Sequence, residues 1–102
     1  SGLIRKRVNS ARAIQQDRFK NNGIYCNSQM TPPMIRKYCR LDKESSALLK
    51  EAFSRLNLTA RSYNRILKVA RTIADLDGTA DIETTHIAEA IQYRALDRSF
   101  FG

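Results

Sequence analysis

The chain has 102 residues, enough for one ordinary domain with a single core and too few for two. Its residues are 42% hydrophobic and 27% charged, a balance typical of globular proteins and not of disordered ones. No run approaches the ~18 consecutive apolar residues of a membrane span, and the N-terminus lacks the apolar core of a signal peptide. We therefore expect one folded cytoplasmic domain without membrane association.

Positive charge is concentrated in the first part of the chain. The net charge is +8, and residues 1–41 carry all of it, because they contain nine Lys or Arg and one acid, Asp17. Residues 42–102 contain nine residues of each sign. A concentrated basic segment attracts polyanions, whether nucleotide phosphates or DNA, so the charge alone does not identify the partner.

The sequence offers no metal site. Twelve residues separate Cys26 from Cys39, neither lies in a Cys-x-x-Cys motif, and His86 is the single histidine. A structural zinc site usually needs four Cys or His ligands. We expect two ordinary thiols, no bound metal, and a local polar contact for His86.

The hydrophobic pattern predicts five helices and no strand. Apolar residues recur at a helical period, and Thr31, Asp42 and Thr59 have the side chains of N-terminal caps, while Gly78 is a typical helix stop. The helices are expected at residues 3–19, 32–39, 43–56 and 60–77, and from residue 83 or 84 to about residue 96.

These elements predict an all-α fold. Short connections between the last three helices favour antiparallel neighbours. We expect a basic linker helix and loop at residues 1–30, followed by a small antiparallel helical bundle at residues 31–102. Phe53, Tyr63 and Tyr93 lie on or near apolar helical faces, so we expect them in the core.

The chain lacks the parts of a stand-alone ATPase. A phosphate-binding loop needs closely spaced glycines, but Gly2, Gly23, Gly78 and Gly102 are scattered. The single histidine has no nearby Ser or Cys nucleophile in the sequence. We expect no catalytic residues and no hydrolysis by this chain alone.

Several segments resemble the C-terminal lid of the magnesium-chelatase-like AAA+ ATPases, in the bacterial branch associated with natural competence. The resemblance covers about residues 2–98. The segments that carry it are residues 4–8 (IRKRV), 27–30 (NSQM), 58–76 (LTARSYNRILKVARTIADL), 86–94 (HIAEAIQYR) and 96–98 (LDR).

The resemblance implies a larger parent protein. In this family a nucleotide-binding core precedes the lid and supplies the phosphate loop, the magnesium-binding acids and the arginine finger. The chain is then expected to be a C-terminal fragment that binds no cofactor alone, whereas the parent uses ATP and Mg²⁺. The expected partners are the preceding core, neighbouring subunits of a hexameric ring, and DNA as a further candidate.

The resemblance assigns Arg61 as the second sensor arginine, which reaches toward the γ-phosphate. Arg61 falls in the first turn of the helix that Thr59 caps, where the positive helix end adds to a guanidinium that can bind two phosphate oxygens. Arg65, one turn further on, is a second candidate. Arg71 lies about 15 Å along the helix axis from Arg61, so we expect it to be solvated or in a subunit contact. The plainer interpretation of Arg61 is an exposed arginine of little energetic value.

The basic residues of the first helix leave three possibilities open. They could pack against the core or a neighbouring subunit, remain solvated, or contact DNA. These residues are Arg5, Lys6, Arg7, Arg12 and Arg18.

Two other functions compete with the lid. A free-standing basic helical DNA-binding domain would use the basic segment as its footprint, although the helix beginning near Thr59 has an apolar stripe instead of base-reading side chains. A protein-interaction bundle predicts neither the basic segment nor Arg61.

Overall fold

The computed structural model of the protein describes the backbone of residues 2–101 and the side chains of residues 5–93. Over this range the fold is all-α, as predicted, and an isolated bridge between Leu41 and Ile82 is the one pairing of β type. The elements are α1 (Gly2–Phe19), the short 3-10 helix η1 (Asn27–Gln29), α2 (Pro32–Tyr38), α3 (Lys43–Arg55), α4 (Ala60–Asp77) and α5 (Thr84–Phe101).

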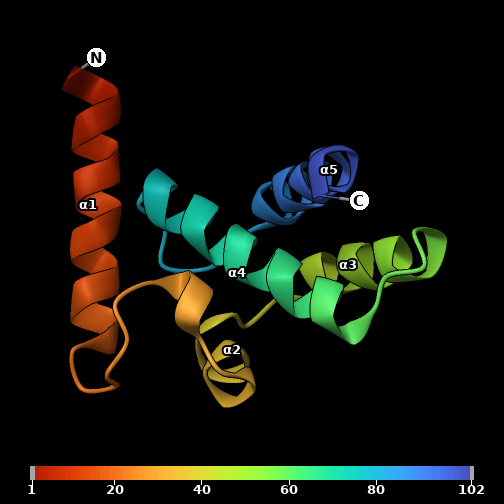
Figure 1. Ribbon diagram of the computed structural model, residues 1–102, viewed down its shortest axis with the longest axis horizontal. Helices are drawn as coiled ribbons and strands as arrows, with labels where there is room; N and C mark the ends of the chain where they lie inside the picture. The colour runs from red at the N-terminus through yellow and green to blue at the C-terminus, as the bar shows by residue number, and fades with distance from the viewer. Residues whose placement is uncertain (1, 102) are drawn as a thin grey trace.

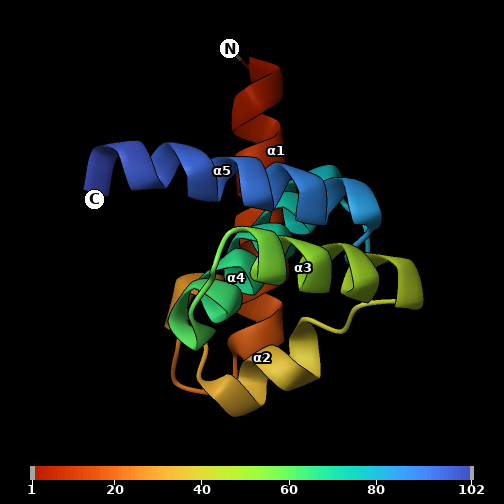
Figure 2. The same cartoon turned by 90° about the vertical axis from the view of Figure 1, so that its right-hand side faces the viewer.

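Helix α4 is the centre of the molecule. It packs most extensively on α5, and also contacts α1, η1 and α2, while α3 packs mainly on α5 (Figure 1). Helix α1 crosses α4 steeply at one side of the molecule, and its N-terminal end projects beyond the other helices in both views (Figure 2). Helix α4 therefore contacts almost every other element.

Side chains that cap the helices explain where α3 and α4 begin. Asp42 Oδ1 accepts the N–H of Ser45 at 2.7 Å, and Thr59 Oγ1 accepts the N–H of Ser62 at 3.1 Å. Helix α4 ends at Gly78, whose φ of 72° is left-handed and favours glycine. All three boundary predictions are confirmed.

The predicted start of α2 after Thr31 is confirmed, whereas the predicted end of the last helix near Leu96 is wrong. The Thr31 side chain forms no capping bond, and α2 begins with only the Thr31 carbonyl accepting the N–H of Ile35. The fixed φ of Pro32 suits a first helical position, which explains why the helix starts there without a side-chain cap. Helix α5 continues to Phe101 instead of ending near Leu96, since no Gly or Pro interrupts it there.

The core gathers around the predicted apolar face of α4, which is confirmed. Phe19 and Met30 belong to the same cluster, so residues 1–30 and 31–102 share one core. The buried apolar residues are Phe19, Met30, Ile35, Cys39, Leu49, Leu58, Ile66, Leu67, Ala70, Ile73, Ala74, Ile82, Ile87 and Ala90.

Two aromatic residues expected in the core are exposed. Phe53 is 39% exposed and contacts Tyr63 edge-on at the periphery, with 5.8 Å between ring centroids. Tyr93 is 58% exposed, whereas Ala90, three residues earlier in α5, is buried. Both predictions of core packing are therefore wrong.

His86 makes the local polar contact predicted for it. Its side chain is buried, Nδ1 accepts the N–H of Glu83 at 2.9 Å, and Nε2 lies 2.8 Å from Asp77 Oδ2. Since Nδ1 is an acceptor, the ring hydrogen is on Nε2 and is donated to Asp77. The imidazole thus joins the start of α5 to the end of α4.

Candidate anion-binding groove

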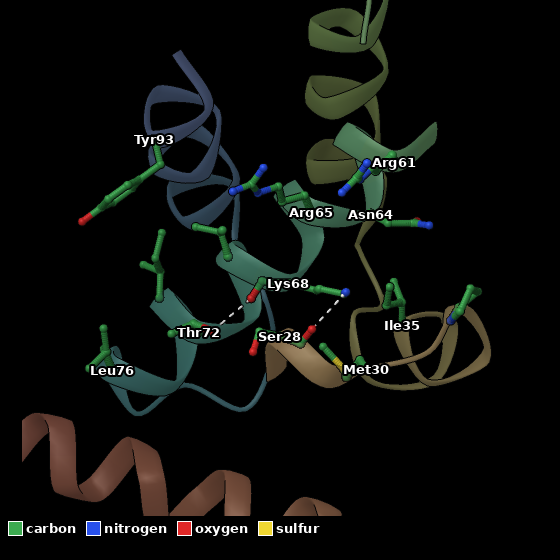
Figure 3. Close-up of a pocket in the computed structure, with 13 residues that line it drawn as sticks. Ser28, Met30, Ile35, Arg61, Asn64, Arg65, Lys68, Thr72, Leu76 and Tyr93 are labelled. Carbon is green, nitrogen blue, oxygen red and sulfur yellow. Dashed lines mark hydrogen bonds between the residues drawn. The ribbon is translucent and has the colours of Figure 1, made fainter. Parts of the chain in front are cut away.

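A groove of about 710 Å³ runs along one side of α4. Helix α4 forms one wall, the segment from η1 into α2 forms the other, and Tyr93 of α5 closes one side (Figure 3). The lining residues are Ser28, Met30, Pro32, Ile35, Arg61, Asn64, Arg65, Lys68, Val69, Thr72, Ile73, Leu76 and Tyr93.

The groove brings both predicted nucleotide-binding arginines together and adds a lysine. Arg61, Arg65 and Lys68 follow one another along α4 (Figure 3). Their spacing places them on one face of the helix, with about 10 Å of axial rise between the first and the last. Among residues 5–93, none of the 13 side chains that line the groove is acidic, so this wall of the groove favours an anion.

Arg61 is exposed in the first turn of α4, two residues after the cap at Thr59. It forms no ion pair with any side chain among residues 5–93, and the groove is the feature it lines. Its guanidinium therefore keeps its planar pair of donors for an external anion.

The floor of the groove is apolar. Met30, Ile35, Val69, Ile73 and Leu76 line it. Binding sites for small molecules commonly combine an apolar surface with a few polar groups that fix orientation. The arrangement suits an anion that also carries an apolar or flat portion, such as a nucleotide.

Near the groove-lining Thr72, a buried carboxylate joins three elements. The Asp75 side chain is 0% exposed and accepts bonds from Arg18 Nη2 at 2.7 Å and Arg18 Nη1 at 2.9 Å. Asn27 Nδ2 lies 2.9 Å from the same carboxylate, and Arg71 Nη2 lies 3.1 Å from it. Charged groups this deeply buried are stable only when paired and hydrogen-bonded. Asp75 thus holds α1, η1 and α4 together.

Asn27 connects this carboxylate to the wall of the groove. Its Nδ2 also donates to Thr72 Oγ1 at 3.1 Å, and its Oδ1 accepts from Arg18 Nη1 at 3.0 Å. Its backbone N–H donates to Gln15 Oε1 of α1 at 3.1 Å. The 27–30 segment, which was predicted to be a loop, is therefore a fixed part of the structure.

Lys68 is tied to the same segment. Its Nζ donates to the carbonyl of Ser28 at 3.1 Å, and its own carbonyl accepts the Thr72 hydroxyl at 3.0 Å (Figure 3). Lys68 was not among the predicted site residues, although it lies seven residues after Arg61 and so shares its helical face.

Arg71 corrects a prediction, since it is neither solvated nor at a surface. Its side chain is 4% exposed, and besides pairing with Asp75 it donates to the carbonyls of Thr79 and Ala80 at 3.0 and 2.9 Å. The Gly78 turn reverses the chain and places these two carbonyls against α4. Arg71 is a structural residue.

The basic residues of α1 divide into two groups. Arg18 is bound to Asp75, and Arg7 donates to Asp77 Oδ1 at 2.9 Å and to the Leu76 carbonyl at 3.3 Å. The others are exposed and form no ion pair with another described side chain; they are Arg5, Lys6 and Arg12. Two of the five candidates therefore pack against this chain's own α4.

The structure offers no site for a metal among residues 5–93, where no three His, Cys, Asp or Glu side chains are placed to hold an ion. Both cysteines are free, and burial raises the pKa of the Cys39 thiol to about 11. Among the described residues, no helix is both long and apolar enough to cross a bilayer.

Comparison with known proteins identifies the family. The family model described as magnesium chelatase, subunit ChlI C-terminal, matches residues 1–94. The chain belongs to this family. The predicted resemblance to magnesium-chelatase-like proteins is therefore confirmed, and this ChlI C-terminal domain is the part of them that the chain represents.

The relatives of the chain are much longer proteins. The chain is 41% identical over 98 residues to Competence protein ComM of Haemophilus influenzae, covering 96% of the chain and 18% of ComM. It is 40% identical over 98 residues to the uncharacterized protein YifB of Escherichia coli, covering 96% of the chain and 19% of YifB. An uncharacterized protein of Mycobacterium tuberculosis is 30% identical over 91 residues, covering 89% of the chain and 18% of that protein. The chain thus spans less than a fifth of these relatives, and no solved structure matches it significantly.

Proposed function

We propose that the chain is the helical lid of an ATP-driven AAA+ ring ATPase, and that Arg61, with Arg65 beside it, binds the phosphates of the nucleotide. The observation that carries this proposal is the shared groove. Arg61, Arg65 and Lys68 line it from one face of α4, none of its lining residues among residues 5–93 is acidic, and its floor is apolar. Membership in the ChlI C-terminal family supports the placement of this domain within a larger ATPase.

The proposed mechanism is a closing motion. ATP and Mg²⁺ bind to the preceding core of the parent, and the γ-phosphate attracts the Arg61 guanidinium from the lid. Because ATP then has a higher affinity for the closed arrangement, its binding shifts core and lid toward it and its hydrolysis releases them. In a cytoplasmic, hexameric ring this motion passes to neighbouring subunits and to a remodelled substrate, which we propose is DNA. The name of the relative ComM supports a role in competence.

ATP hydrolysis by the full-length parent tests the proposal. We expect Arg61→Ala to lower the rate by about 10³-fold at saturating Mg²⁺, the scale of arginines that contact a transferred phosphate. Arg36→Ala is the matched control, because Arg36 is an exposed arginine of α2 that does not line the groove. Size-exclusion chromatography with light scattering would establish that both variants form the same ring as the wild type.

Unchanged hydrolysis by Arg61→Ala in an intact ring would remove this residue from the nucleotide site. The alternative of a DNA-binding domain would then be favoured, because Arg5, Lys6 and Arg12 are exposed on α1. That alternative predicts that replacing these three residues with Ala weakens DNA binding by this chain and flattens its salt dependence.

A further inference from the structure

We propose that Lys68 is a third phosphate-binding residue of the groove, and that its contact with Ser28 links a bound polyphosphate to α1 through Asn27. This inference rests on the proposed function, because it adds a ligand to the site assigned to Arg61. It goes further in two respects: it assigns a role to Lys68, and it identifies the physical connection between the groove and α1.

The first step is the availability of Lys68. Its ammonium has three N–H donors, and only the bond to the Ser28 carbonyl engages a described residue. The same group can therefore hold Ser28 and a phosphate oxygen at once. Because the contact with Ser28 already restricts this long side chain, an anion recruits it at a lower entropic cost than a freely moving lysine.

The second step is the row of cations. Arg61, Arg65 and Lys68 occupy successive turns of one face of α4, and all three line the groove. A polyphosphate carries several charged groups along a chain, so it can contact all the cations of such a row. A single small anion can contact only one or two of them. The predicted ligand is thus a phosphate chain, as in a nucleoside triphosphate.

The third step leads from the groove to α1. Ser28 is preceded by Asn27, which is 1% exposed and bonds to Thr72 and Asp75 of α4. Asn27 also accepts from Arg18, the α1 residue that pairs with Asp75. Asn27, Asp75 and Arg18 have few alternative partners in the interior. If phosphate binding moves Lys68, and the Ser28 carbonyl with it, the contacts of Arg18 therefore change as well. Asn27 is here a positioning residue, whereas Lys68 touches the ligand.

Calorimetric titration of the chain with inorganic tripolyphosphate at low ionic strength tests the ligand assignment. We expect Lys68→Met to weaken binding about three- to fivefold, the range of a partly exposed, salt-screened charge contact. Lys68→Arg should restore most of the affinity, because it returns the charge. Lys50→Met is the control, since Lys50 is an exposed lysine of α3 outside the groove. Circular dichroism would establish that every variant is folded.

Including Arg61→Ala in the same titration separates the two proposals. If Arg61→Ala weakens binding and Lys68→Met does not, the inference about Lys68 is wrong and the role of Arg61 stands. If Lys68→Met weakens binding and Arg61→Ala does not, Lys68 remains an anion ligand and the assignment of Arg61 fails. Absence of tripolyphosphate binding by the wild-type chain would overturn the ligand assignment of Lys68.

The link to α1 has its own readout. At saturating tripolyphosphate we expect the NMR signals of the Arg18 Nε–H and the Asn27 amide to shift in the wild type and in Lys68→Arg. In Lys68→Met, saturated at higher concentration, both shifts should be lost. Equal shifts in Lys68→Met and wild type, or none in the saturated wild type, would overturn the connection through Lys68.

Discussion

Asp75 is the centre of the buried polar network that also contains Arg18, Asn27 and Arg71. Its carboxylate is fully buried between Arg18 and Arg71 and also accepts from Asn27. Removing one member of a buried ion pair leaves the other charges uncompensated, and this usually costs more than the pair itself contributes.

We expect Asp75→Asn to lower the free energy of unfolding by about 3–5 kcal/mol, because Arg18 and Arg71 lose their counter-charge. Urea denaturation followed by circular dichroism measures this change. Asp81→Asn is the control, since Asp81 is an exposed carboxylate and its loss should have little effect. A change below about 1 kcal/mol in Asp75→Asn, within the range of surface substitutions, would contradict the structural role of the network.

The two thiols should react very differently. Burial raises the pKa of the Cys39 thiol to about 11, whereas Cys26 is partly exposed. The thiolate is the reactive form, so at pH 8 we expect iodoacetamide to modify Cys26 alone, and both residues once the chain is unfolded. Mass spectrometry of the intact protein counts the labels.

The same shift predicts a loss of stability in alkali. A thiol whose pKa is higher in the folded than in the unfolded state binds its proton more tightly when folded. Its contribution to stability is complete below the unfolded value of 9.0 and decreases as the pH rises toward 11. If iodoacetamide rapidly labelled both Cys26 and Cys39 of the native chain at pH 8, burial would not protect the Cys39 thiol.

At the scale of the helices, the cap of α4 positions the start of the cationic face. Thr59 Oγ1 accepts the Ser62 N–H, and Arg61 lies between them in the sequence. We expect Thr59→Ala to lower the free energy of unfolding by about 1 kcal/mol, the usual cost of losing such a cap.

Thr31→Ala provides a matched comparison, because Thr31 also precedes a helix but its side chain forms no capping bond. We expect a change of less than about 0.5 kcal/mol, typical of a surface substitution. Equal losses in the two variants, measured by urea denaturation, would show that the hydrogen bond of Thr59 does not distinguish the two helix starts.

Local sequence signals predicted most of the helices and part of the groove. The caps at Asp42 and Thr59 and the stop at Gly78 depend on neighbouring residues only, and so they could be recognised from the sequence. Arg61 was predicted from the resemblance to the family, and Arg65 because it lies one turn further on the same face of the helix. Lys68 follows from the same spacing but was not considered.

The polar interior could not be predicted because it joins residues far apart in the chain. Arg18 and Asp75 are separated by 57 positions, and neither side chain indicates by itself which partner it meets. One signal was available, however. Along α4, every fourth residue lies on the same side of the helix, and one such series is Tyr63, Leu67, Arg71 and Asp75. Two opposite charges that follow two hydrophobic residues on a partly buried face indicate an ion pair within the core.

Across the whole molecule, α1 belongs to the same packed unit as the other helices. Phe19 is buried in the common core, and Arg18 is bound to α4. In the proposed ring, the lid would therefore move together with α1, and the change of angle between core and lid would take place before this helix in the chain.

The attachment of α1 is stronger at one end than at the other. Arg18 and Asp75 form a buried pair, with side chains 13% and 0% exposed, whereas Arg7 and Asp77 are 54% and 42% exposed and contribute less. The two pairs are about 16 Å apart along the helix. Tension applied to the N-terminal end of α1 would load these contacts one after the other, the weak pair first. The helix would thus peel away gradually under a small pull, while full detachment would require the force needed to open the buried pair.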